Sequence, residues 1–139
     1  MDLESRLALD EDEPAVLAFV GENGGGIVRD EAVAGLYWLT LRPISQPTEW
    51  FYVRLAWTVY PHHAPSVLFA EAVGGAVGSA RAWPSIPGYQ PPSRICKPFT
   101  AEGFAAHAEW VWPTTGNGFL WVVTVLQDDL DTKYAGRAA

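Results

Sequence analysis

The chain has one cysteine, Cys96, which stands in the sequence Arg94-Ile95-Cys96-Lys97-Pro98-Phe99. A lone cysteine in an apolar domain is most often a small buried hydrophobic residue. Here, however, a long segment rich in glycine and proline, residues 72–93, leads to the cysteine, and two cations flank it. The side chains of Arg94 and Lys97 favour the thiolate if they approach the sulfur. We therefore predict a reactive cysteine, with a buried structural cysteine as the alternative.

The three histidines are the other candidates for acid–base or metal chemistry. His62 and His63 are adjacent on a predicted turn and do not point at one site unless the backbone bends between them. No pair among the histidines and Cys96 has zinc-ligand spacing on a shared element, and no Gly-x-Ser-x-Gly motif of a serine hydrolase is present. We predict neither a metal site nor a cofactor.

Composition limits the class of protein. A chain of 139 residues is about the size of one domain, so we expect a single domain over residues 1–139. Hydrophobic residues make up 49% of the chain and seven residues are tryptophan, which is enough apolar surface for a folded core. The net charge of -7 argues against nucleic-acid binding, which requires clustered lysine and arginine.

Two features predict the compartment. A single cysteine forms no internal disulfide, and the acidic start Met1-Asp2-Leu3-Glu4 lacks the basic and apolar regions of a signal peptide. Apolar runs such as residues 119–126 are far shorter than the roughly 20 residues needed to cross a bilayer. We expect a cytoplasmic protein that does not engage a membrane.

The middle of the chain predicts an antiparallel meander. Residues 36–41 form one expected strand, a proline-marked loop follows, and residues 50–59 form a longer strand with alternating apolar side chains. After a turn, residues 66–69 supply a third strand. Residues 4–20 are compatible with a helix interrupted at Pro14 or with a helix followed by a strand, and the sequence does not decide between them.

The elements around the cysteine are less regular. Prolines exclude helix from most of residues 72–93, and Thr100 is the expected cap of a short helix that runs to about Trp110. A second helix is expected after residues 115–118 because apolar residues recur at helical spacing, although the β-branched content makes a strand the competing prediction. Asp128 and Asp129 are expected at a solvated helix end, with a base that orients a substrate amine as the alternative. The overall class is α+β.

This order of elements, with three of its motifs, resembles the ubiquitin-conjugating enzyme family, whose UBC-like fold packs an antiparallel meander against flanking helices. The turn Tyr60-Pro61-His62-His63-Ala64-Pro65 is similar to the family's Tyr-Pro-x-x-Pro-Pro, with alanine in place of one proline. Ser66-Val67-Leu68-Phe69 is similar to its x-Val-x-Phe strand, and Ile95-Cys96 stands where the family has the Ile-Cys of its catalytic position. The resemblance covers about residues 36–130.

The chain also departs from the family pattern. The family's His-Pro-Asn has its nearest counterpart in Trp83-Pro84-Ser85, with longer spacings on both sides, so the histidine and asparagine are both missing. In common members that asparagine supports the loop before the cysteine and stabilises the oxyanion, a contribution of roughly several kcal/mol at analogous sites. The resemblance therefore implies one of two alternatives: another donor serves here, with Ser85, Gln90, Ser93 and Asn117 as the candidates, or aminolysis is impaired. Members that lack His-Pro-Asn include a bacterial group, which this short chain resembles most.

The resemblance implies a mechanism and partners. Cys96 accepts the C-terminal glycine of a ubiquitin-like protein from an activating enzyme, as a thioester, and passes it to an amine of a protein substrate, expected to be a lysine. His107 supplies general-base help if its side chain turns back toward Cys96, with a solvent-facing or capping histidine as the alternative. Trp83, Pro84 and Ser85 form the supporting loop.

The tryptophans have two interpretations. Trp38, Trp57 and Trp121 lie in periodic elements and are expected in the core. The others near the cysteine either line a dry groove for the incoming tail or also pack in the core; these are Trp83, Trp110 and Trp112.

Three functions remain open from the sequence. The first is the conjugating enzyme. The second is a catalytically silent UBC-like module that binds a ubiquitin-like protein or another partner, with Cys96 buried. The third is a small α+β domain that binds an apolar ligand between its sheet and its tryptophan-rich loop.

Overall fold

The protein is built on a four-stranded antiparallel sheet, seen in a computed structural model that describes residues 1–113 and 115–139. The strands follow one another in the sheet in chain order. Their bounds are Gly26–Arg29 for β1, Leu36–Leu41 for β2, Phe51–Ala56 for β3 and Ser66–Ala70 for β4. The meander predicted from residues 36–69 is confirmed, although β3 is shorter than the predicted strand at residues 50–59.

Strand β1 was missed by the sequence analysis. It is a four-residue edge strand that follows consecutive glycines, and none of its residues is fully buried. A short exposed edge needs no apolar alternation, so its sequence does not differ from that of a loop.

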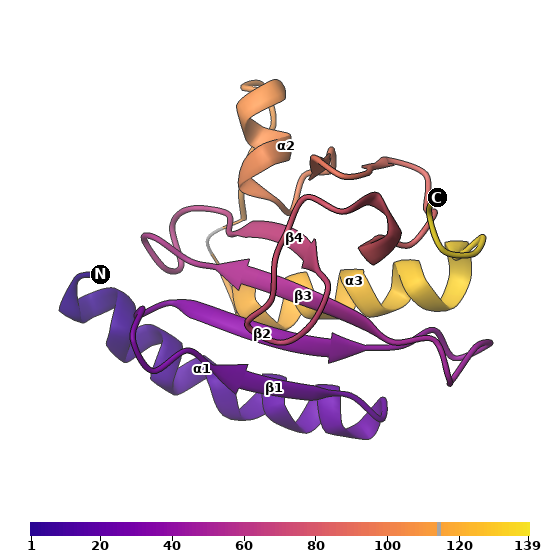
Figure 1. Ribbon diagram of the computed structural model, residues 1–139. Coiled ribbons are helices and arrows are strands. Elements are labelled where there is room, and N and C mark those ends of the chain that lie inside the picture. The colour runs from indigo at the N-terminus through magenta and orange to yellow at the C-terminus, as the bar shows by residue number, and fades with distance from the viewer. Residues whose placement is uncertain (114) are drawn as a thin grey trace.

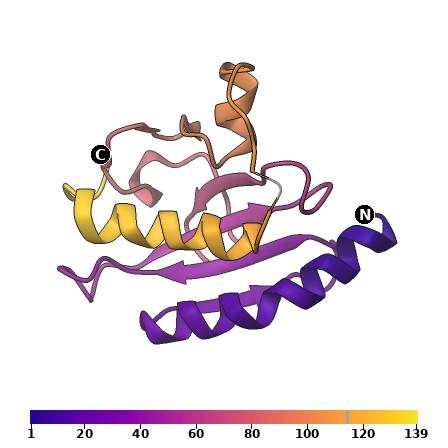
Figure 2. The same ribbon diagram turned by 180° about the vertical axis from the view of Figure 1, so that it is seen from behind.

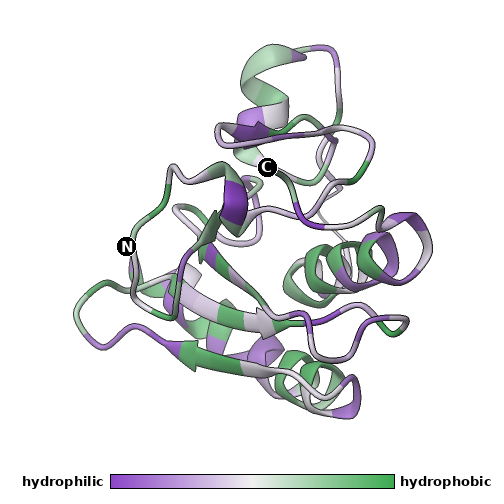
Figure 3. Ribbon diagram, turned by 45° about the vertical axis from the view of Figure 1, so that its right-hand side comes forward, coloured by the Kyte–Doolittle hydropathy of each residue, from purple (hydrophilic) through white to green (hydrophobic). Residues whose placement is uncertain are grey.

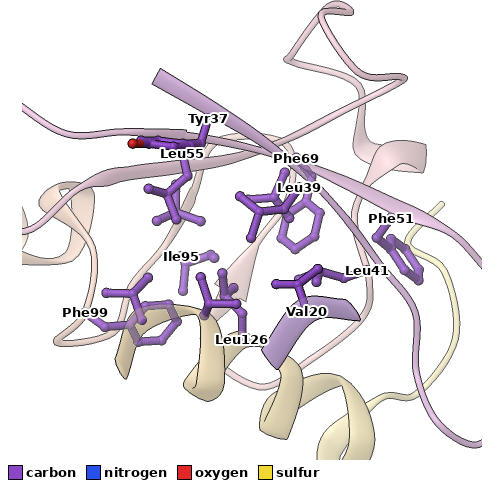
Figure 4. Close-up of a cluster of buried hydrophobic side chains, with 14 of the residues drawn as sticks. Val20, Tyr37, Leu39, Leu41, Phe51, Leu55, Phe69, Ile95, Phe99 and Leu126 are labelled. Atoms are coloured by element: carbon purple, nitrogen blue, oxygen red, sulfur yellow. The ribbon is translucent and has the colours of Figure 1, made fainter. Parts of the chain in front are cut away.

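Side chains alternate across the sheet as the sequence predicts. Phe51, Val53 and Leu55 of β3 are fully buried, whereas the residues between them are only partly buried. The register places Val53 between Leu39 of β2 and Phe69 of β4, so the three strands present one continuous apolar face. Figure 4 shows this face packed against α3 and the end of α1.

Helix α1 covers part of that face. It runs without a break from Leu3 to Glu22, so the uncertain N-terminal segment is one helix with Pro14 inside it. Asp2 caps its start, and Leu9, Val16 and Val20 are buried. Packing of this apolar stripe outweighs the cost of the internal proline.

Helix α3, Gly118–Lys133, lies beside α1 on the same face of the sheet (Figures 1 and 2). The side chain of Asn117 caps it by accepting a hydrogen bond from the backbone N–H of Leu120 at 2.8 Å. Most of its buried residues are apolar, with Gln127 and Asp129 as the polar exceptions, and Figure 3 shows polar residues on its outer side. The predicted helix is confirmed over the competing strand, since its apolar residues recur with a period near 3.6.

The connection from β4 to α2 is mostly irregular, as predicted. It contains a short 3-10 helix, η1 (Ala80–Ala82), and a small hairpin made of β5 (Tyr89–Gln90) and β6 (Arg94–Ile95). In Figure 1 its first part crosses the sheet face opposite α1 and α3. On that outer face Leu36, Trp38 and Ala70 form a small second cluster.

Helix α2, Ala101–Ala106, projects from the sheet near β4 (Figure 1). Thr100 caps it, as predicted, but it ends four residues before Trp110. Among the described residues, no helix is long and apolar enough to cross a membrane.

Candidate functional site

Cys96 follows directly after β6, at the end of what we call the Cys96 segment, residues 88–97. Tyr89 and Ile95 face each other across the hairpin and are both buried. The Cys96 backbone N–H donates to the carbonyl of Gly88 at 2.8 Å, which extends the pairing by one residue. The cysteine itself is free and partly exposed. The backbone that carries Cys96 is therefore held in place by hydrogen bonds.

Helix α2 fixes the segment from one side. The Thr100 hydroxyl donates to the carbonyl of Ile95 at 2.7 Å and accepts from the backbone N–H of Gly103 at 2.9 Å. Gly103 packs so closely on the segment that a Cβ there would lie 2.3 Å from the carbonyl oxygen of Lys97. One threonine thus both starts the helix and binds the strand before the cysteine.

Helix α3 fixes the segment from the other side. The Lys97 ammonium donates to the Asp129 carboxylate at 3.1 Å, and the Tyr89 hydroxyl donates to the same carboxylate oxygen at 2.9 Å. Asp129 is 1% exposed. Burial, together with the negative charge of Asp129, raises the pKa of Tyr89 far above its usual value near 10.

This position of Asp129 corrects the sequence analysis, which placed it with Asp128 at a solvated helix end. Asp128 is exposed, as expected, but Asp129 faces inward with Leu126 and Leu130. The signal was the helical period itself: Asp129 follows Leu126 by three residues and Val122 by seven, on one face. Tyr89, Thr100 and Gly103 were likewise not identified as parts of the site.

The two cations beside Cys96 have other partners. The Arg94 guanidinium donates to the side-chain oxygen of Gln90 at 2.7 Å, and Lys97 is bound to Asp129. The contact of Arg94 stabilises the hairpin, and the contact of Lys97 joins the hairpin to α3. Neither side chain has a described interaction with the sulfur of Cys96, which the predicted effect on the thiolate requires.

His107 follows the last residue of α2 as its cap. Its ring stacks on Trp110, with 4.0 Å between the ring centroids, and its Nδ1 lies 3.1 Å from a carboxylate oxygen of Glu109. These contacts match the capping alternative. A general-base role at Cys96 would require the ring to leave both partners.

The predicted supporting loop, Trp83-Pro84-Ser85, is paired with the C-terminal tail. Backbone hydrogen bonds join Ser85 to Ala135 and Gly136, and another joins Trp83 to Ala138. Trp83 is fully buried against Phe69, so it belongs to the core and does not line a groove.

The other candidate oxyanion donors differ in how they are bound. The Asn117 amide donates to the carbonyl of Asp12, and its oxygen caps α3, so this side chain is committed to structure. Gln90 uses its oxygen to accept from Arg94. Ser85 and Ser93 are exposed.

The turn after β3 is tied to both long helices. The buried Tyr60 hydroxyl donates to the Asp12 carboxylate of α1 and accepts from the backbone N–H of Phe119 at 3.2 Å. Burial and then the bond to Asp12 raise the pKa of Tyr60 well above 10. Trp112 donates its indole N–H to the carbonyl of Pro61 at 2.8 Å. His62 and His63 are exposed on this turn.

The remaining tryptophans divide between core and surface. Trp38 and Trp57 are buried, as expected, whereas Trp121 is 38% exposed and contacts the partly buried Trp112. Within residues 1–113 and 115–139, no three or more histidine, cysteine, aspartate or glutamate side chains are grouped to hold a metal ion. A cavity of about 450 Å³ lies between α1 and residues 29–35, and charged side chains such as Arg6, Asp10 and Glu31 line it.

Comparisons with known proteins do not assign the chain to a family. No family model, no curated protein and no solved structure matches the chain.

Proposed function

We propose that the chain is a ubiquitin-like-protein conjugating enzyme with a UBC-like fold. The support is the order of its elements: one helix, a four-stranded meander, an irregular segment that ends in a cysteine, and two helices. The turn at Tyr60, which carries the Tyr-Pro motif, joins β3 to β4 and is a second point of support. The α+β architecture alone is shared by many functions, so the function rests on the site.

The observation that carries the proposal is the setting of Cys96. Cys96 as a whole residue is partly exposed, while its backbone N–H and the carbonyl of Ile95 are fixed by hydrogen bonds. A buried structural cysteine would be inaccessible to a protein-bound thioester. A positioned, accessible thiol is what transthiolation needs.

The proposed reaction has two steps. The Cys96 thiolate attacks the thioester carbonyl of the modifier's C-terminal glycine, a new carbon–sulfur bond forms, and the thiolate of the activating enzyme leaves. An amine of the protein substrate, expected to be a lysine, then attacks the same carbonyl. The Cys96 thiolate leaves, and the amine nitrogen loses its proton to solvent or to a nearby base as the amide forms.

A catalytically silent UBC-like binding module is the second candidate. It is favoured by one observation: Arg94 and Lys97, the two cations beside the cysteine, bind Gln90 and Asp129. In that case Cys96 would have no charged group assigned to activate it, and the fold would serve to bind a ubiquitin-like protein.

A thioester assay separates the two candidates. The protein is mixed with an activating enzyme, its ubiquitin-like protein and ATP, and the products are run on reducing and non-reducing gels. We expect a thiol-sensitive adduct with wild type and a thiol-resistant ester with Cys96→Ser. If the activating enzyme becomes charged and wild type forms no adduct, the enzyme proposal fails and the binding module replaces it.

A further inference from the structure

Asp129 is a buried charge whose partners converge from three places. Its Oδ2 accepts from the Tyr89 hydroxyl at 2.9 Å and the Lys97 ammonium at 3.1 Å, and its Oδ1 accepts from the Lys133 ammonium at 3.1 Å. A carboxylate that is 1% exposed is tolerated in a core only when it is paired and hydrogen-bonded. These partners therefore cannot be removed from it without cost.

Two of the three partners belong to the Cys96 segment and stand on either side of the hairpin. Tyr89 is in the incoming strand β5, and Lys97 directly follows the cysteine. The Lys97 ammonium also lies 5.4 Å from the centre of the Tyr89 ring, so the two side chains contact each other as well as the carboxylate. One buried carboxylate thus connects both arms of the hairpin to helix α3.

The stem of Lys97 adds a packing contact. A Cβ built at Gly88 would lie 2.9 Å from Cε of Lys97, so the lysine chain runs directly over the residue whose carbonyl accepts from Cys96. A continuous series of contacts therefore joins Asp129 to Lys97, Lys97 to Gly88, and Gly88 to the backbone N–H of Cys96. In the family that the chain resembles, an asparagine of His-Pro-Asn supports this loop, and here that residue is missing.

We propose that Asp129 is a positioning residue for Cys96: through Lys97 and Tyr89 it fixes the Cys96 segment on α3. Without it the hairpin opens locally, and the thiol loses its alignment for transfer. This inference rests on the proposed function for its catalytic consequence, but the local ordering of the segment is measurable without any activity.

The first measurement is amide hydrogen exchange by nuclear magnetic resonance. The Cys96 N–H reports opening of the segment, and the Val53 N–H in the central strand β3 reports global unfolding. In Asp129→Asn we expect Cys96 exchange to accelerate about tenfold more than Val53 exchange. Asp128→Asn, which removes an exposed carboxylate from the adjacent position, is the matched control and should leave the ratio unchanged.

Lys97→Met keeps the experiment informative if Asp129→Asn fails to fold, because Asp129 retains Tyr89 and Lys133 in that variant. We expect the same selective acceleration at Cys96. If the variants change Cys96 and Val53 exchange equally, Asp129 supports global stability alone and the proposal is overturned.

The second measurement is thioester formation at varied concentrations of the charged activating enzyme. We expect the maximal rate of Asp129→Asn to fall about tenfold while its half-saturating concentration stays within twofold, since the buried Asp129 cannot itself contact the activating enzyme. A rise in the half-saturating concentration with an unchanged maximal rate would refute positioning. If wild type forms no thioester, the proposed function fails, and hydrogen exchange alone decides whether Asp129 orders the segment.

Discussion

Replacing Gly103 by alanine tests how closely α2 packs on the Cys96 segment. In an exposed helix the change stabilises by about 1 kcal/mol, because glycine is the poorer helix former. At Gly103 the added Cβ would lie 2.3 Å from the carbonyl oxygen of Lys97 and 3.0 Å from its backbone nitrogen. Ordinary contact begins near 3.4 Å, so either α2 or the segment must retreat by about 1 Å. Both atoms are backbone and cannot rotate away.

The expected sign is therefore opposite to helix propensity. Overpacking costs about 1–3 kcal/mol, and an overlap of this size with backbone atoms belongs to the upper part of that range, about 2–3 kcal/mol. The propensity gain offsets about 1 kcal/mol of it. We expect Gly103→Ala to lower the free energy of unfolding by about 1–2 kcal/mol. The matched control is Gly21→Ala in α1, where a Cβ would meet nothing within 4 Å and stability should rise by about 0.5 kcal/mol.

Urea unfolding followed by tryptophan fluorescence measures both variants. The rate at which an aromatic disulfide reagent modifies Cys96, measured in the same samples, reports whether the segment has moved. We expect Gly103→Ala to react at least severalfold faster than wild type and Gly21→Ala to react at the wild-type rate. If Gly103→Ala is as stable as Gly21→Ala, the close packing of α2 on Lys97 is refuted.

Three further predictions concern pH and capping. Burial raises the folded-state pKa of Tyr89, so the stabilisation that its neutral hydroxyl gives the fold is complete below pH 10 and is lost as pH rises above 10 and the tyrosine of the unfolded chain ionises. Above pH 10 the free energy of unfolding should therefore fall more steeply for wild type than for Tyr89→Phe, with a difference in slope of about 1.4 kcal/mol per pH unit. Hydrogen bonds from the Ser5 backbone and hydroxyl lower the pKa of Asp2 below 3.8, so the stabilisation of α1 by its carboxylate is present above pH 3.8 and is lost as pH falls through the folded-state pKa. Asp2→Asn still caps the helix but does not titrate, so its circular-dichroism signal should lack this loss at acid pH. Asn117→Asp keeps the cap of α3 and removes the amide donor, so modifier transfer to free lysine should stay within twofold of wild type, whereas Asn117→Ala should lose about 1 kcal/mol of stability.

Each of these has a clear contrary result. Parallel alkaline slopes for wild type and Tyr89→Phe would mean that the tyrosine ionises alike in both states. An identical acid limb in Asp2→Asn would show that the cap does not depend on the charge of Asp2. A large loss of lysine transfer in Asn117→Asp at wild-type stability would identify Asn117 as the missing oxyanion donor.

Regular elements were predictable where a single period dominates the sequence. The alternation in β3 and the helical spacing from Phe119 to Leu130 each bury one face, and the structure has them there. The cap at Thr100 was predictable from its side chain, but its second bond to Ile95 depends on the hairpin before it.

The candidate site was less predictable because its parts meet only through tertiary packing. Lys97 and Asp129 are 32 residues apart, and no local pattern shows that they pair. Adjacent aspartates at a helix end suggested a solvated pair, although only Asp128 is solvated. His107 was predicted to act as a general base if its side chain turned back toward Cys96. Helix α2 ends just before it, and its ring contacts Trp110 and Glu109 instead.

The most direct test of the central claim is the intact mass of the protein after incubation with an activating enzyme, its ubiquitin-like protein and ATP, measured without reductant. We expect a species heavier by the mass of the modifier minus one water. It should disappear on addition of thiol, be absent in Cys96→Ala, and resist thiol in Cys96→Ser. An unmodified mass for wild type, in a reaction where the activating enzyme is itself charged, would contradict the assignment of Cys96 as the carrier.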